Sequence, residues 1–354
     1  MTTLSMKTAE RDVNRLDSLP ELLAYRKRIT ELLRDHPLGS FPQEYNDTVN
    51  ELQDKMIERA VSLAIHSLDE EGHGGPPVPY AFVLLGSGGR REQTLWSDQD
   101  NALIYADPEP GVETLVHEYF RKLGDRIVSS LTDTGYPPCD GGVTCNHDRW
   151  NKPVSAWKTM IQEWEQDGSW EAVRYLLIVA DLRHLHGDRE LARAVQAEFA
   201  AYTLRTASAE KRMLENTLRR KPALGLFGRL ITERYGENAG HFDVKYGLYI
   251  PFASGIRLLA IHERTWATST ARRLELVRQK GQLSAELLLD WQRNFSSALY
   301  FRNKATQEPE PGKEAPPPML NIAMLSEEEK RELIRALRSV RKLQKTVAKL
   351  VAAR

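Results

Sequence analysis

Few cysteines, no long apolar run and no net charge limit what this chain can be. The two cysteines, Cys139 and Cys145, cannot build a disulfide scaffold, which predicts a reducing, cytoplasmic location. No uncharged apolar run approaches the ~18–20 residues that a membrane span needs, so we expect no membrane partner. Lysine and arginine together number 49, as do aspartate and glutamate. Because the resulting net charge is zero, the chain has no general electrostatic attraction to nucleic acid. We therefore do not expect nucleic acid as a partner.

The length and the changing texture of the chain predict several domains. At about 150 residues per domain, 354 residues correspond to two or three. Residues 1–70 show helical patterns, 71–150 show short apolar strands with glycine turns, and 151–306 are helical again. The proline-rich stretch 307–320 predicts a linker, and the apolar stripe within 321–354 predicts a final helix that packs on the fold.

The most informative stretch runs from Gly86 to Asp100. Residues 80–85 before it are apolar and bounded by glycine, which predicts a buried strand. Gly86 and Ser87 open the turn that follows. Glycine lets backbone N–H groups approach a phosphate closely, and a serine hydroxyl donates to a phosphate oxygen. Residues 90–96 predict a short helix, whose N-terminus would point at the same anion.

Two aspartates end this stretch. Asp98 and Asp100 stand two residues apart at the predicted start of a second strand, 101–105. The period of two in a strand places both carboxylates on one face, where they can share divalent ions. A glycine turn or an Asp-x-Asp pair alone is more often only a turn or a solvated strand end. Their order after a buried strand predicts a site for a nucleotide and Mg²⁺ or Mn²⁺, the ions that phosphoryl transfer uses.

The stretch also carries a family resemblance. Gly-Ser, an arginine, a glutamate and Ser-Asp-x-Asp at this spacing resemble the signature of nucleotidyltransferases, and most closely that of signal-transduction members related to PII-uridylyltransferase. Trp150 with Trp157, and the segments 135–143, 181–188 and 243–245, resemble other parts of that family. The resemblance implies an α/β nucleotidyltransferase core, with a small mixed sheet and helices, followed by a helical C-terminal domain that binds substrate.

The resemblance further implies roles for single residues. The nucleotide-binding residues it implies are Gly86, Ser87, Arg90, Arg91, Glu92 and Lys245. Either arginine would hold the triphosphate, and Glu92 would orient an arginine or hold the turn. Lys245 would reach a phosphate as a point charge, unless it is a solvated surface lysine. Asp98 and Asp100 would be both catalytic residues and metal ligands.

A third carboxylate usually completes such a site, and the chain offers two. Asp181 belongs to an Asp-x-Arg phrase that resembles the family, and it is the preferred catalytic residue. A salt bridge between Asp181 and Arg183 at a helix end is an almost equally weighted alternative. Asp140, in the region of a predicted third strand, is the competitor.

The expected activity is transfer of a nucleoside monophosphate from a nucleoside triphosphate to an acceptor, with release of pyrophosphate. The acceptor would be a protein side chain, a small molecule or RNA, and the resemblance to PII-uridylyltransferase favours a protein. Two other classes stay open. One is a non-catalytic nucleotide-binding regulator, favoured by the undecided third carboxylate. The other is an RNA-binding or toxin–antitoxin component, which would rest on the basic polar side of the final helix. No pattern identifies the base or the oligomeric state.

Overall fold

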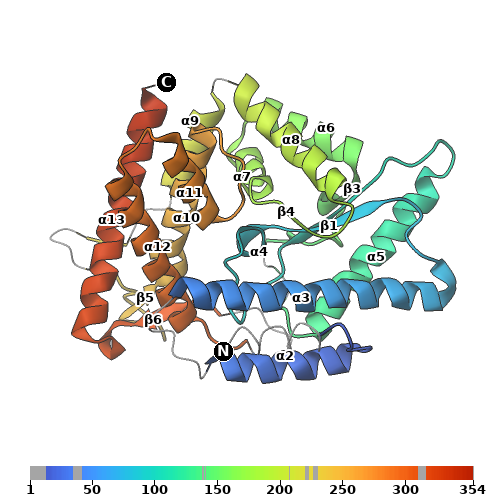
Figure 1. The fold of residues 1–354 in the computed structure, drawn as a ribbon, viewed down its shortest axis with the longest axis horizontal. Coiled ribbons are helices and arrows are strands. Elements are labelled where there is room, and N and C mark those ends of the chain that lie inside the picture. Colours follow the sequence, from blue (N-terminus) through green and yellow to red (C-terminus); the bar gives the residue numbers. More distant parts are fainter. Residues whose placement is uncertain are drawn as a thin grey trace.

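The computed structural model describes most of the chain and places a small sheet between helices (Figure 1). The described residues are 13–34, 42–137, 139, 141–206, 208–219, 223–225, 230–309 and 316–353. Helices cover both faces of the sheet, and a group of helices lies beyond one end of it. This arrangement confirms the predicted α/β core with a helical C-terminal part.

The main sheet has four strands in the order β3-β2-β1-β4. They are β1 (Tyr80–Leu84), β2 (Asn101–Tyr105), β3 (Asn151–Pro153) and β4 (Arg183–Gly187). Strand β1 is antiparallel to β2 and to β4, whereas β2 and β3 are parallel, so the sheet is mixed as predicted. Two of the four strands come from residues after 150, where the sequence patterns predicted a helical domain. Both are short and polar, so they lack the apolar run that marks a buried strand.

The two faces of the sheet belong to two different hydrophobic cores. Ala81 and Val83 face a core that continues into the helices after residue 153. Phe82 and Leu84 point the other way, as alternation along a strand requires, into a core shared with the N-terminal helices. The helices of this second core are α2 (Leu19–Arg34), α3 (Pro42–Leu68) and α5 (Glu113–Asp133). The N-terminal helices therefore pack directly against the strand that leads into the predicted site.

The rest of the described chain is mainly helical. The longer helices are α6 (Val154–Asp167), α7 (Trp170–Val179), α8 (Arg189–Arg205), α9 (Ala209–Leu218), α10 (Ile250–His262), α11 (Thr270–Lys280), α12 (Ala285–Ala305) and α13 (Glu327–Ala352). Short helical turns are η1 (Asp69–His73), η2 (Asp148–Trp150), η4 (Lys245–Tyr249) and η5 (Ile322–Met324). Strands β5 (His241–Asp243) and β6 (Met319–Asn321) pair with each other. Within the described ranges, no helix combines the length and apolar character of a membrane span.

The final helix, α13, is built into the fold. Ser326 accepts a hydrogen bond from the backbone N–H of Glu329, whose side chain accepts one from the backbone N–H of Ser326, so the two residues form a capping box. The apolar stripe of α13 lies against α10 and α12, and Figure 1 shows these helices side by side. Leu333, Leu337 and Val340 are fully buried in this contact.

Removal of residues 319–354 is expected to yield an insoluble protein or one that melts far below the full chain. Each large apolar side chain left in water forfeits about 1.5–3 kcal/mol, and α13 buries several of them. Their combined loss approaches the whole stability of a typical domain. Thermal unfolding checks this, with Lys342→Ala on the exposed side of α13 as the control. A truncated protein that melts with the full chain would contradict it.

Candidate functional site

Strand β1 runs into α4 (Gly86–Arg90), a single helical turn whose close approach to its neighbours requires glycine. Gly86 has φ of 49°, and a Cβ there would stand 2.1 Å from a carboxylate oxygen of Asp100. A Cβ on Gly89 would stand 1.9 Å from the carbonyl oxygen of Asp181. The glycines thus let α4 lie directly against Asp100 and against the chain that enters β4.

The helix lies earlier than the predicted one over residues 90–96. It ends at Arg90, and Arg91, which caps it, has a left-handed φ of 58°. Asn50 on α3 donates its side-chain amide to the carbonyl oxygen of Gln93 at 3.2 Å, and Gln53 donates to that of Thr94 at 3.0 Å. Because these carbonyls are bonded by α3, the segment after Arg91 is held in an irregular conformation. No local pattern in the motif itself could have shown this support.

Asp98 and Asp100 come directly before β2, as predicted. The backbone N–H of Leu85 donates to the carbonyl oxygen of Asp100 at 2.9 Å, which joins the end of β1 to this segment. Burial and the neighbouring carboxylate of Asp98 raise the pKa of Asp100 to about 7. The two carboxylates therefore lie close enough to repel each other, an arrangement that a divalent cation would relieve.

Two residues distant in sequence reach this pair. The thiol of Cys139 donates to Oδ1 of Asp100 at 3.2 Å, a contact that the sequence did not indicate. The ammonium of Lys245, on η4, acts to lower the pKa of Asp100 and so lies within electrostatic reach. The helical part of the chain thus contributes a positive charge to the predicted site.

Arg90 has no free nitrogen for a triphosphate, which corrects the expectation drawn from the resemblance. Its Nε donates to Glu92 at 2.8 Å, its Nη1 to Asp181 at 2.5 Å and its Nη2 to the hydroxyl of Tyr249 at 2.7 Å. Arg90 and Glu92 are both buried. The side chain of Arg91, in contrast, is 42% exposed and lies 3.7 Å from Asp54, so it remains available to a ligand.

Asp181 is not placed as the third metal ligand. Its two oxygens accept hydrogen bonds from Arg90, Arg257 and Arg273, and although burial opposes ionisation, these guanidinium groups hold its pKa below the ordinary value. In the part of the chain that is described, no three side chains of His, Cys, Asp or Glu form a metal-binding group. Asp181 therefore does not complete the Asp98–Asp100 pair.

The alternative, a salt bridge between Asp181 and Arg183, is also absent from the contacts of both residues. Arg183 instead makes a bidentate ion pair with Asp54 on α3, at 2.9 and 2.7 Å. It also donates to the carbonyl oxygen of Gly88 at 2.7 Å, so that β4 supports α4. Asp140, the competing third carboxylate, lies outside the described residues.

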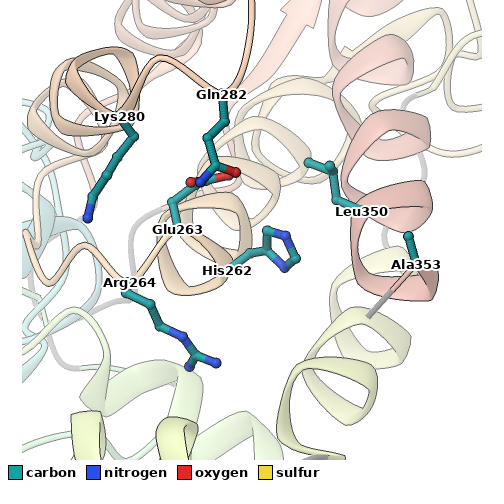
Figure 2. A pocket seen from close by; sticks show the side chains of 7 residues that line it. All are labelled: His262, Glu263, Arg264, Lys280, Gln282, Leu350 and Ala353. Carbon is teal, nitrogen blue, oxygen red and sulfur yellow. The ribbon is translucent and has the colours of Figure 1, made fainter.

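A separate hollow of about 420 Å³ lies where the C-terminal ends of α10, α11 and α13 meet (Figure 2). Figure 2 shows Leu350 of α13, and Ala353 just after that helix, facing His262 across it. Its further lining residues are Glu263, Arg264, Lys280 and Gln282. None of these is a predicted site residue, and the hollow has no glycine turn or aspartate pair. We therefore place the candidate site at α4 and β2.

Replacement of Asp100 by asparagine is expected to stabilise the protein without metal at high pH. Because the folded-state pKa of about 7 lies above the value of 3.8 in an unfolded chain, folding loses stability as pH rises between these values. The gain from Asp100→Asn should therefore grow from pH 5 to pH 7 and level off above, at about 1–3 kcal/mol. Urea unfolding across this range with EDTA measures it, and Asp133→Asn is the exposed control. A gain that does not change with pH would contradict the proximity of the two carboxylates.

Comparison with known proteins covers both parts of the chain. A family model described as "Putative nucleotidyltransferase DUF294" matches residues 27–171, which include α4, Asp98 and Asp100. A second model, described as "Putative nucleotidyltransferase substrate binding domain", matches residues 208–351, which include Lys245 and α9 to α13. No curated protein matches the chain significantly.

Proposed function

Because the chain belongs to the nucleotidyltransferase family that these two models describe, we propose that it transfers a nucleoside monophosphate from a nucleoside triphosphate to an acceptor. The observation that carries the proposal is the pair Asp98 and Asp100 beside the α4 turn. Burial of Asp100 and the neighbouring carboxylate of Asp98 raise the pKa of Asp100, and this supports a role of the pair in holding Mg²⁺ or Mn²⁺. A bound divalent ion would neutralise phosphate oxygens and lower the pKa of the attacking group.

The chain's own groups divide the work around this pair. The α4 turn brings Gly86 directly against Asp100, and a phosphate would lie here, at Gly86 and the Ser87 that follows it. Arg91 and Lys245 would neutralise the phosphate oxygens that the metal does not reach. Arg90 and Glu92 act indirectly, because they tie the turn to Tyr249 in the helical part. The triphosphate would thus lie between the sheet and the helices that follow it.

The acceptor is proposed to be a protein or a small molecule. The description of the second family model, a substrate-binding domain, supports a role of α9 to α13 in holding the acceptor or the nucleotide. A relation to PII-uridylyltransferase would favour a protein acceptor and a regulatory role, and it stays a prediction. The second candidate function is a nucleotide-binding regulator without turnover. It is favoured by the absence of a third carboxylate beside Asp98 and Asp100 among the described residues.

Pyrophosphate release tests the proposal. The purified protein with Mg²⁺ is supplied in turn with each of the four nucleoside triphosphates, with and without a lysate fraction as a source of acceptor. We expect release of pyrophosphate with one preferred nucleotide, together with transfer of an α-phosphate label to the acceptor. Nucleotide binding without release under any condition would favour the regulator. A protein that neither binds a nucleotide nor releases pyrophosphate would contradict both candidate functions.

Lys245→Gln is expected to weaken binding of the preferred triphosphate about tenfold, the effect of losing about 1.4 kcal/mol of interaction with a phosphate. Isothermal titration measures the change. Lys122→Gln, at an exposed position of α5, is the matched control and should bind as the parent does. Equal affinity of the two variants would show that Lys245 does not contact the nucleotide.

A further inference from the structure

The exposed face of α13 carries charge of one sign. Between residues 331 and 349, every exposed position is an arginine or a lysine. These positions, the basic stripe, are Arg331, Arg335, Arg338, Lys342, Lys345 and Lys349. Their spacing alternates between four and three residues, so they follow one nearly straight line about 27 Å long. Seven residues of this segment are basic and one is acidic, whereas the whole chain has a net charge of zero. Positive charge is therefore concentrated on this helix.

The basic stripe lacks acidic partners within the molecule. Among the described residues, no side chain of the stripe in 335–349 forms an ion pair. The beginning of the same helix differs, since Lys330 pairs with Glu327 at 2.8 Å and Glu329 pairs with Lys304 of α12. Like charges three or four residues apart on a helix repel each other, and the helix dipole favours basic side chains only in the last turn. The stripe therefore does not stabilise α13, and an acidic partner would relieve its repulsion.

A hollow of about 480 Å³ lies along the stripe. Its described lining residues are Arg338, Arg341, Lys342, Lys345, Thr346 and Lys349. Arg341 donates to the carbonyl oxygen of Leu224, which ties this face of α13 to the segment 223–225. No described lining residue is acidic or has a purely apolar side chain. The hollow thus presents several cationic groups to a single ligand and no apolar surface.

The length and composition of the stripe favour a short acidic segment of a protein over other polyanions. Helices that lie on membranes insert apolar side chains, and no exposed position of 331–349 is apolar. A long nucleic acid would extend beyond the stripe, where the rest of a chain of zero net charge carries the balancing negative charge and repels it. Proteins that hold single-stranded nucleic acid also present aromatic side chains to the bases, which this face lacks.

We propose that the basic stripe of α13 binds an acidic segment of a partner protein. In an extended segment, alternate side chains lie on one side about 6–7 Å apart. The cations of the stripe follow one another at a rise of about 4.5–6 Å, and their long side chains adapt to the difference. Glutamates at alternate positions would therefore meet successive cations. The stripe lies on a different element from Asp98 and Asp100, so this interaction goes beyond nucleotidyl transfer and is measured without a nucleotide.

Binding of a fluorescent peptide to the full chain tests the proposal. The probe has about six Glu-Ser repeats, which span roughly 40 Å when extended. Fluorescence anisotropy at an ionic strength of about 0.1 M should show saturable binding that weakens as salt is added. A peptide with Gln-Ser repeats should not bind. The triple variant Arg338→Gln, Lys342→Gln and Lys345→Gln should bind the acidic peptide at least about tenfold more weakly, because three charge pairs are lost.

A matched control removes three exposed cations elsewhere. Lys27 on α2 and Arg121 and Lys122 on α5 are exposed, so their replacement by glutamine changes the net charge equally and should leave peptide binding unchanged. Thermal unfolding verifies that both triple variants are folded. Equal affinity of the two variants, or no binding of the acidic peptide to the parent, would overturn the proposal. An oligouridylate with as many charges as the peptide is the alternative probe. Tighter binding of this RNA than of the peptide would assign the stripe to nucleic acid and would also overturn the proposal.

Carbodiimide coupling locates the peptide on the parent protein and needs no variant. The reagent joins a glutamate of the bound peptide to a nearby lysine through an amide bond, and mass spectrometry identifies the lysine. We expect cross-links at Lys342, Lys345 and Lys349, which added salt should suppress. Cross-links only at lysines outside α13 would place the peptide elsewhere and contradict the proposal.

Discussion

The double substitution of Asp98→Asn with Asp100→Asn should abolish metal-dependent nucleotide binding and lower turnover at least about 1000-fold. Asparagine keeps the shape of both side chains but removes the charges that would hold the ion. The fold should survive, because the substitution also removes a repulsion between carboxylates. Titration of nucleotide into each protein, with Mg²⁺ and with EDTA, measures the loss of binding. Circular dichroism verifies that the fold is retained.

A matched control removes two exposed carboxylates elsewhere. Asp125 and Asp133 on α5 are exposed, so Asp125→Asn with Asp133→Asn changes the net charge equally without touching the site. This control should bind nucleotide as the parent does. If the Asp98 and Asp100 double variant also binds and turns over normally, the nucleotide site lies elsewhere in the molecule.

Asp181→Asn should cost about 3–5 kcal/mol of unfolding free energy, a large share of the stability of a domain. Asparagine leaves Arg90, Arg257 and Arg273 buried against one another without their shared carboxylate. Denaturant unfolding at pH 7 measures the loss. Addition of Arg257→Met should restore part of it, because the second change removes one of the unpaired charges.

Two outcomes separate this structural role from a catalytic one. Any loss of unfolding free energy in Arg183→Ala should be independent of the loss in Asp181→Asn. Arg183 is not a partner of Asp181, because it pairs with Asp54 and with the carbonyl oxygen of Gly88. The folded fraction of the Asp181→Asn protein should bind metal with the same affinity as the parent. Lost turnover with unchanged stability would instead place Asp181 in the chemistry, as the sequence pattern indicated.

The central strands and the site motif could be predicted because their signals are local. Strand β1 is a continuous apolar run, and the glycines after it stand where side chains would collide with Asp100 and with the backbone at Asp181. The two aspartates directly precede β2, so their proximity follows from chain geometry alone. The capping box of α13 is likewise encoded in a few neighbouring residues.

The partners of Arg90 and Asp181 could not be predicted because they come from distant helices. Arg257 lies on α10 and Arg273 on α11, and no spacing in the sequence marks them as partners of one carboxylate. Arg90 and Arg91 are adjacent, yet one is buried and the other is partly exposed, and Arg91 stands at the end of α4 in a left-handed conformation. Short polar strands such as β3 and β4 also escape prediction, since only pairing with β1 and β2 makes them strands.

A crystal structure with Mn²⁺ and a non-hydrolysable analogue of the preferred triphosphate is the most direct measurement of the central claim. The account predicts an anomalous manganese peak coordinated by carboxylate oxygens of Asp98 and Asp100 at about 2.1–2.3 Å. The phosphates should lie against the α4 turn at Ser87, within reach of Arg91 and Lys245. Manganese and nucleotide bound elsewhere, for example in the hollow of Figure 2, with the two aspartates free of metal, would contradict it.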